Sequence, residues 1–157
     1  RHFEVLKASM ECAAELQAVH YVVHAGMMPL TQSAGLDTAY ERQREWLMQA
    51  GDLAKSLGLE VLLELHDFEE LGHVCSTVDF VGINNRSLKT FDVDIKRSLA
   101  MSAAIPDSFC KVAESGINNP EQIRLFKSNG FEAFLIGEYF MKTHQPGVAL
   151  EKLIQQI

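Results

Sequence analysis

Short apolar runs that alternate with amphipathic stretches are the feature that most constrains the fold of this 157-residue chain. From Gly58 onward each run is apolar at both odd and even positions, which is typical of a strand buried on both faces. The runs cover residues 60–65, 78–83, 109–113 and 133–136. Strands that are separated by helices pair in parallel through right-handed crossovers. The pattern therefore predicts an α/β fold.

The stretches between the runs carry the start and stop signals of helices. We expect helices over residues 67–76, 94–104, 119–129 and 146–157. Asn119 and Pro120 are typical of an N-cap followed by a first-turn proline. Gly58 and Gly130 stand where helices end, a position that favours glycine.

The first 57 residues add one more unit of the same kind. Their pattern predicts a helix over 5–18, a strand over 19–24, a loop over 26–37 and a helix over 38–57. The total is five strands, whereas a complete eight-stranded barrel needs about 250 residues. We therefore expect residues 1–157 to form a single domain, either a partial barrel or a smaller open sheet.

Charge and cysteine content exclude several classes of partner. The net charge of -7 argues against nucleic acid or an anionic membrane surface, because both require a basic face. No apolar run reaches membrane-spanning length. The three cysteines are odd in number and form no CxxC pair, so we expect no disulfide scaffold and a cytoplasmic location.

Polar side chains follow the ends of the last four apolar runs. The carboxyl ends of parallel strands meet at one rim, where α/β barrels build their sites. Residues two apart in a strand share a face, so several of these groups should project together. The candidates for catalysis are Glu64, Asn84, Arg86 and Glu114. Carboxylates that lie near a cation can take separate acid and base roles.

The last two strand ends also predict a phosphate site. In barrels of this kind, the loops after strands seven and eight and a short extra helix bind phosphate. The candidates are Ser115, Gly116, Gly137 and Glu138. The two glycines would let backbone N–H groups approach the anion closely.

Four segments in this part of the chain resemble those of a known family. They are VLLELH at 61–66, GINNRSLKTF at 82–91, VAESGI at 112–117 and FLIGE at 134–138, the last followed by Phe140 and Met141. In order and spacing they are similar to the C-terminal half of indole-3-glycerol phosphate synthase, over roughly residues 57–157. The resemblance implies a (βα)8 barrel represented by strands four to eight.

The resemblance also implies an activity. The family is a carbon–carbon lyase of tryptophan biosynthesis that closes the indole ring of a carboxyphenylamino-deoxyribulose phosphate, with loss of carbon dioxide and water. It uses no metal and no organic cofactor, so the implied partner is a phosphorylated small molecule.

Site roles follow from the same resemblance. Glu64 would be the general base or proton shuttle, and Glu114 would assist at the carbon that forms the indole. Asn84 and Arg86 would orient the substrate and support the carboxylates. The phosphate would be held mainly by backbone N–H groups of the four residues at 115–116 and 137–138.

The N-terminal part departs from the family pattern. Residues 1–3 align loosely with the strand-three segment that carries the general-acid lysine, and residues 19–24 align with strand four. Arg1 then stands in the lysine position, and arginine gives up its proton too reluctantly to act as an acid. The loop at 26–38 is longer and more polar than the family's. We expect that this chain alone does not complete the reaction, and that it pairs with an N-terminal barrel half or with a second copy.

Simpler interpretations stay open for individual residues. Glu64 could be a structural partner of Arg86, Asn84 could form a turn, and Gly137 could merely end a strand. His20 and His24 have a metal-like spacing for a helix, but a strand here argues against a metal site. We expect His66 to be a hydrogen-bonded residue of the rim. The functional alternatives are a barrel fragment that binds phosphorylated ligands without turnover, or one that self-associates.

Overall fold

The computed structural model of the chain describes residues 2–24 and 36–157. The chain divides into two compact units, Arg1–Val81 and Gly82–Ile157, and each is described by itself. The first unit contains α1 (His2–Glu15), β1 (His20–His24), α2 (Leu36–Ser56), β2 (Glu60–Leu65) and the 3-10 helix η2 (Phe68–His73). Strand β3 (Phe80–Asn84) crosses the boundary between the units. The second unit continues with α3 (Ile95–Ser102), β4 (Cys110–Glu114), α4 (Pro120–Ser128), β5 (Phe131–Leu135), α5 (Glu138–Met141) and α6 (Pro146–Ile154).

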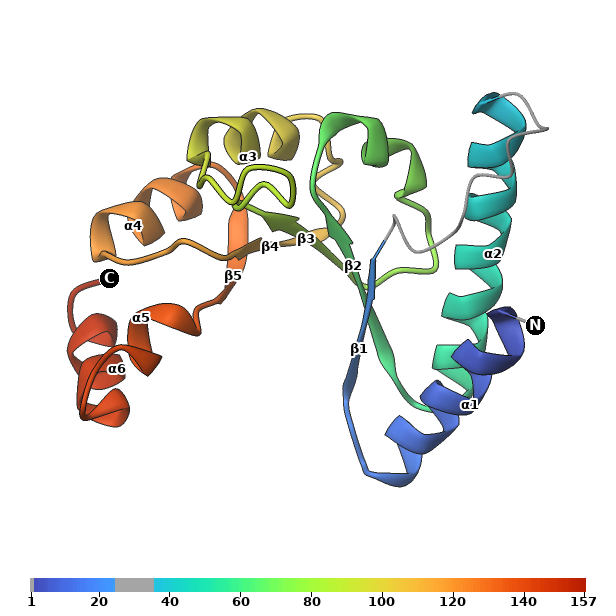
Figure 1. The fold of residues 1–157 in the computed structure, drawn as a ribbon, viewed down its shortest axis with the longest axis horizontal. Helices are drawn as coiled ribbons and strands as arrows, with labels where there is room; N and C mark the ends of the chain where they lie inside the picture. Colours follow the sequence, from blue (N-terminus) through green and yellow to red (C-terminus); the bar gives the residue numbers. More distant parts are fainter. Residues whose placement is uncertain (1, 25–35) are drawn as a thin grey trace. The chain divides into compact units, whose positions relative to one another are not determined.

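The strands run in the order β1-β2-β3-β4-β5, which confirms the predicted α/β fold with parallel pairing (Figure 1). In the first unit β1 pairs with β2 in parallel, and His20 and His24 stand opposite Glu60 and Glu64. In the second unit β4 pairs with β5 in parallel, with a register irregularity between Lys111 and Val112.

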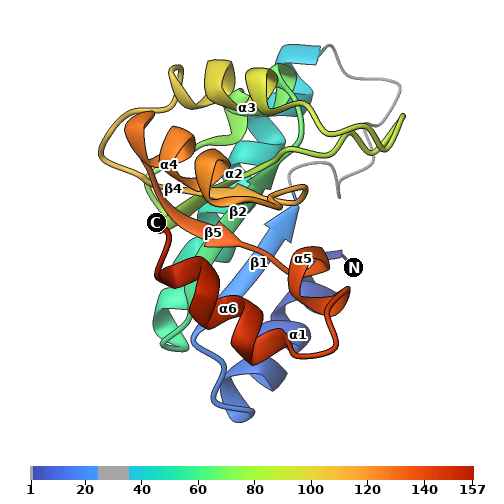
Figure 2. The same cartoon turned by 90° about the vertical axis from the view of Figure 1, so that its left-hand side faces the viewer.

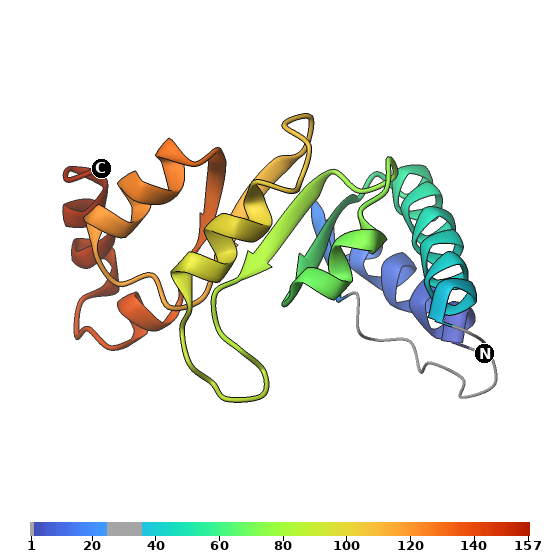
Figure 3. The same cartoon turned by 90° about the horizontal axis from the view of Figure 1, so that it is seen from above.

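Helices cover the strands within each unit. Helices α1 and α2 contact each other, and α2 also contacts β2 (Figure 3). In the second unit α4 contacts β5, and the short α5 lies beside α6 (Figure 2). None of the described helices combines the length and the apolar character needed to cross a membrane.

The helix signals act as the sequence predicts. The Asn119 side chain accepts a hydrogen bond from the Gln122 N–H at 2.9 Å, directly before Pro120 in the first turn of α4. Gly58 and Gly130 have φ values of 73° and 83° just after α2 and α4, a left-handed conformation in which glycine carries no Cβ penalty.

The core of each unit is built from the predicted strands and the inner faces of their helices. Leu63, with none of its surface exposed, lies in the buried strand β2. In the second unit the buried Phe126 of α4 packs edge-on against Phe131 of β5, with ring centroids 4.9 Å apart. Aromatic pairs of this geometry contribute about 0.5–1.5 kcal/mol beyond their burial.

The N-terminal alignment with a barrel strand is wrong. His2 and Phe3 begin α1, because Phe3, Leu6 and Met10 recur at helical spacing and Met10 is fully buried. Arg1, which was aligned with the family lysine, lies outside the described residues, as does most of the loop expected over 26–37.

Candidate functional site

A pocket of about 1050 Å³ in the second unit brings together most of the residues that the sequence predicts for the site. Its volume is that of a typical small-molecule site. Six of the eight predicted residues line it: Arg86, Glu114, Ser115, Gly116, Gly137 and Glu138. They come from the end of β4 and the segments that follow β3, β4 and β5, so the structure brings these parts of the second unit together at one pocket.

Asn84 at the end of β3 does not line the pocket. Its Oδ1 accepts a hydrogen bond from the Arg86 backbone N–H at 2.9 Å, which is the turn that asparagine favours. The Asn84 carbonyl accepts from Arg97 Nη2 of α3 at 2.9 Å. The hydrogen bond between Asn84 and Arg86 agrees with the simpler interpretation, in which Asn84 shapes a turn. This turn sets the position of Arg86.

Arg86 connects the loop after β3 to the start of α5. Its Nη2 lies 2.6 Å from Glu138 Oε2, and its Nη1 donates to the Phe91 carbonyl at 3.1 Å. Lys142 Nζ approaches the other oxygen of Glu138 at 2.6 Å. The pKa of the Glu138 carboxyl is lowered, first because Lys142 donates a hydrogen bond to it and then because both cations favour its charged form. The carboxylate of Glu138 is thus neutralised by two cations at the wall of the pocket.

The turn after β4 has an unusual backbone. Ser115 and Gly116 have φ values of 64° and 68°, so two successive residues adopt the left-handed conformation. A Cβ placed on Gly116 would lie 2.5 Å from Val93 Cγ1, so no other residue fits without movement of Val93. For a serine this conformation costs about 1–2 kcal/mol, and such strain persists where the surrounding structure enforces it, often at functional sites.

Asn85 is not among the predicted site residues, but it holds the turn after β4 in place. It is fully buried, its side chain donates to the Ser115 carbonyl at 2.8 Å, and its backbone N–H donates to the Glu114 carbonyl at 2.8 Å. These contacts join the loop after β3 to the turn after β4. The sequence signal for Asn85 is its place in the segment GINNR, directly after Asn84. Because neighbouring residues of a strand point to opposite faces, Asn85 points away from the face of Asn84.

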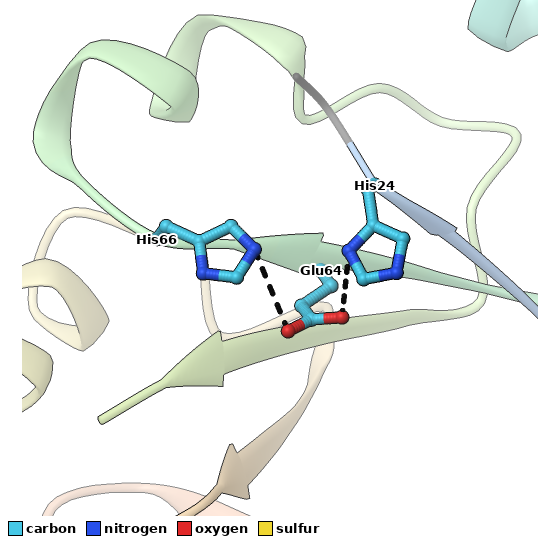
Figure 4. Close-up of side chains that lie close together, drawn as sticks. All are labelled: His24, Glu64 and His66. Carbon is cyan, nitrogen blue, oxygen red and sulfur yellow. Dashed lines mark ion pairs between the residues drawn. The ribbon is translucent and has the colours of Figure 1, made fainter. Parts of the chain in front are cut away.

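Glu64 lies in the first unit, at the end of β2, in a cluster with two histidines (Figure 4). His24 Nδ1 of β1 lies 2.9 Å from Glu64 Oε2, and His66 Nε2 lies 3.5 Å from Glu64 Oε1. The charged partner of Arg86 is Glu138, in the second unit. Within the described part of the chain, His66 donates its backbone N–H to Glu70 Oε2 at 2.5 Å, and neither of its ring nitrogens has a hydrogen-bond partner. The hydrogen bond expected of His66 is thus made by its backbone.

These arrangements fit anion binding in the second unit and proton transfer at buried carboxylates. The pocket offers a guanidinium, a tight glycine turn and the first N–H groups of α5, which have no acceptor within the helix. Glu114 is 6% exposed and Glu64 is also 6% exposed, so both carboxylates are largely removed from bulk water.

Parallel strands alternating with helices, and a site at the strand ends, define an α/β protein of the (βα)-barrel type that is represented here by five strands. A sequence model of indole-3-glycerol phosphate synthase matches residues 41–153. The chain belongs to this family.

Two curated relatives with the same name show how much of the family the chain spans. The indole-3-glycerol phosphate synthase of Bacteroides thetaiotaomicron is 44% identical over 115 residues, which cover 73% of this chain and 44% of the relative. That of Koribacter versatilis is 44% identical over 104 residues, which cover 66% of this chain and 40% of the relative. The chain thus spans less than half the length of these relatives.

Solved structures support the fold alone. A D-tagatose 3-epimerase-like protein superposes with a TM-score of 0.63 at 16% identity, covering 98% of this chain and 67% of that chain. The 3-keto-D-glucoside 4-epimerase of E. coli gives a TM-score of 0.57 at 14% identity, covering 98% of this chain and 70% of that chain.

Proposed function

We propose that this chain carries the phosphate-binding and carboxylate-bearing part of an indole-3-glycerol phosphate synthase. The reaction is the decarboxylating ring closure of a carboxyphenylamino-deoxyribulose phosphate in tryptophan biosynthesis, in the cytoplasm. The observation that supports this most is the pocket of the second unit, where the family segments GINNR, VAESGI and FLIGE supply adjacent walls.

The phosphate would lie between the turn at Ser115 and Gly116 and the start of α5 at Gly137 and Glu138. At Gly137 an added Cβ would meet nothing within 4 Å, so the absence of a side chain there leaves room for a phosphate oxygen to approach the backbone N–H groups. Arg86 would add a charged donor, because its guanidinium already lies at this wall of the pocket. The carboxylate of Glu138 does not repel the anion strongly, since Arg86 and Lys142 neutralise it.

Proton transfer is assigned to two buried carboxylates. Glu114 ends β4 and lines the same pocket as the proposed phosphate site. Glu64 lies near the end of β2 in the first unit, where His24 Nδ1 lies 2.9 Å from its carboxylate. A general acid or base of this kind contributes about 10²–10⁴-fold to the rate.

Binding and turnover are tested separately. Calorimetry with indole-3-glycerol phosphate measures binding to the chain. Arg86→Met should weaken binding about 10- to 100-fold, the effect of losing a charged hydrogen bond. The exposed Lys127→Met, on α4 outside the pocket, is the control and should leave affinity unchanged. Equal affinities for the Arg86 and Lys127 variants would count against this phosphate site.

Turnover is measured by the fluorescence of the indole product, with the N-terminal half of the Bacteroides relative supplied as a separate chain. Two results together support the lyase: the mixture of the two chains restores turnover, and Glu64→Gln lowers this turnover at least about 100-fold while the affinity for indole-3-glycerol phosphate is retained. Binding without turnover under these conditions favours the alternative, a phosphate-ligand-binding fragment.

We also propose that the chain associates with a second copy or with an N-terminal barrel half. The strands at the two ends of the sheet order carry exposed apolar side chains, with Val22 of β1 45% exposed and Leu135 of β5 49% exposed. Terminal strands offer unpaired backbone groups to a partner. Size-exclusion chromatography with light scattering should give a mass above 17.5 kDa. A monomer that unfolds cooperatively would refute self-association.

A further inference from the structure

The cluster of His24, Glu64 and His66 in the first unit has the composition of a metal site. We propose that these three side chains bind a first-row divalent transition ion, with Zn²⁺ as the reference ion. Two imidazoles and one carboxylate are ligands that zinc, nickel and cobalt prefer, whereas Mg²⁺ and Ca²⁺ prefer oxygen ligands alone. This inference goes beyond the proposed lyase activity and shares Glu64 with it. A Glu64 carboxylate that binds the ion does not act as a free general base at the same time, so the zinc titration is carried out on the chain alone.

The backbone places the three ligands on one side of the β1–β2 pair. His24 stands directly opposite Glu64 in the parallel register, and His66 follows Glu64 by two residues (Figure 4). The rings of His24 and His66 are stacked, with centroids 5.9 Å apart and planes inclined by 9°. Each ring turns a nitrogen towards the carboxylate that lies between them.

The distances are close to those of a bound site. One donor atom from each residue can be chosen such that all three lie within 4.8 Å of one another. A tetrahedral zinc site, with bonds of about 2.0–2.2 Å, needs separations of roughly 3.3–3.5 Å between ligand atoms. The side chain of His24 is 46% exposed, so its ring can turn to supply the remaining contraction.

Burial and charge also point to a cation. The side chains of Glu64 and His66 are only 8% and 11% exposed. Both nitrogens of His66 are buried without a hydrogen-bond partner among the described residues, and an ion bound at Nε2 would give that nitrogen a partner. A histidine nitrogen attracts the carboxylate only when that nitrogen carries a proton. A divalent ion bound by the two histidines and the carboxylate would replace these protons.

The position of His66 is fixed independently of its ring. Its backbone N–H donates to the Glu70 carboxylate, and Asp67 caps η2 directly after it. The exposed side of His24 leaves an approach for the ion and for a water in the fourth coordination position, as in zinc sites with three protein ligands.

The same two strands offer a matched control. His20 and Glu60 also stand opposite each other, with His20 Nε2 2.9 Å from Glu60 Oε2. Among the described residues, the group of side chains that could hold a metal ion contains neither His20 nor Glu60. Removal of His20 changes the same residue type on the same strand pair without touching the three proposed ligands.

The test is calorimetric titration of the full chain with Zn²⁺, with Mg²⁺ as the comparison ion. We expect one tight Zn²⁺ site per chain, affinity at least about tenfold weaker in His24→Ala and in His66→Ala, and unchanged affinity in His20→Ala. His24→Cys keeps a zinc ligand at the position and should restore much of the affinity that His24→Ala loses. This rescue separates loss of a ligand from loss of folding.

Cobalt provides a second readout. Co²⁺ bound by two nitrogens and a carboxylate should give visible absorption that the His66→Ala variant lacks. Zinc affinity that is the same in the wild-type chain and in both alanine variants would overturn the proposal. Equal weakening by His20→Ala would also overturn it.

Discussion

Replacement of Gly116 by alanine tests whether the turn after β4 is closed by contact with Val93. The added Cβ would lie 2.5 Å from Val93 Cγ1 and 2.7 Å from Cγ2, well inside van der Waals contact. The φ of 68° adds a backbone penalty of about 1–2 kcal/mol, partly offset by about 0.4–1 kcal/mol from the stiffer unfolded chain. Overpacking of this kind costs a further ~1–3 kcal/mol. We expect Gly116→Ala to lower the free energy of unfolding by about 2–4 kcal/mol.

Gly130→Ala is the matched control in the same unit. Gly130 has a φ of 83°, but a Cβ there meets only Lys111 Nζ at 3.8 Å, an ordinary contact. This variant should therefore lose only the backbone term, about 1 kcal/mol. Val93→Ala in the Gly116→Ala background removes both clashing methyl groups and should recover most of the difference. The Val93 Cβ, at 3.2 Å, limits the recovery.

The measurement is urea unfolding followed by far-ultraviolet circular dichroism, with m-values compared across the four chains. Equal stabilities of Gly116→Ala and Gly130→Ala would refute the steric argument, because the left-handed backbone alone would then account for both. A double variant that is no more stable than Gly116→Ala would show that Val93 does not close the turn.

Three further outcomes are expected. Ser115→Gly should raise the free energy of unfolding by about 0.5–1 kcal/mol, because glycine adopts the φ of 64° without a Cβ penalty, and urea unfolding measures it. Burial lowers the pKa of His73 from its ordinary value of 6.5, although its contacts with Glu70 act the other way, so the unfolded chain binds the proton more readily and stability falls as pH drops below 6.5. His73→Gln should therefore lose less stability between about pH 7.5 and about pH 5.5 than the wild-type chain does, and an equal loss would contradict this. Lys142→Met should raise the pKa of Glu138 towards its ordinary value of 4.5, as followed by NMR titration, whereas an unchanged midpoint would show that the hydrogen bond from Lys142 does not set it.

The elements could be predicted because periodicity is a local property. The run at 60–65 coincides with β2, and the Asn119-Pro120 signal fixes the start of α4. Strand β5 begins at Phe131, two residues before the predicted start, because the charged Glu132 interrupts the apolar pattern there. Helix α1 begins at His2, before the predicted start at residue 5, because Phe3 already belongs to the helical spacing of Leu6 and Met10.

The candidate site was predictable only where its residues stand in the segments that resemble the family. Arg86 and Glu114 follow from strand ends, but the neutralisation of Glu138 by Lys142 depends on how α5 turns. The contact of Val93 with Gly116 depends on the path of the loop after β3. The grouping of His24 with Glu64 depends on which residues stand opposite each other in β1 and β2, and neither strand contains that information alone.

The two His–Glu pairs of the first unit have a consequence for how β1 and β2 align as the chain folds. In β1 exposed and buried side chains alternate, which disfavours a shift by one residue, but a shift by two keeps every side chain on its face. Such a shift would place Val22 opposite Glu60 or Glu64 and would separate both histidines from their carboxylates. The pairs stand four residues apart on each strand, so either shift breaks both at once. Hydrophobic burial thus selects the face, and polar pairing selects one alignment among those that burial cannot distinguish.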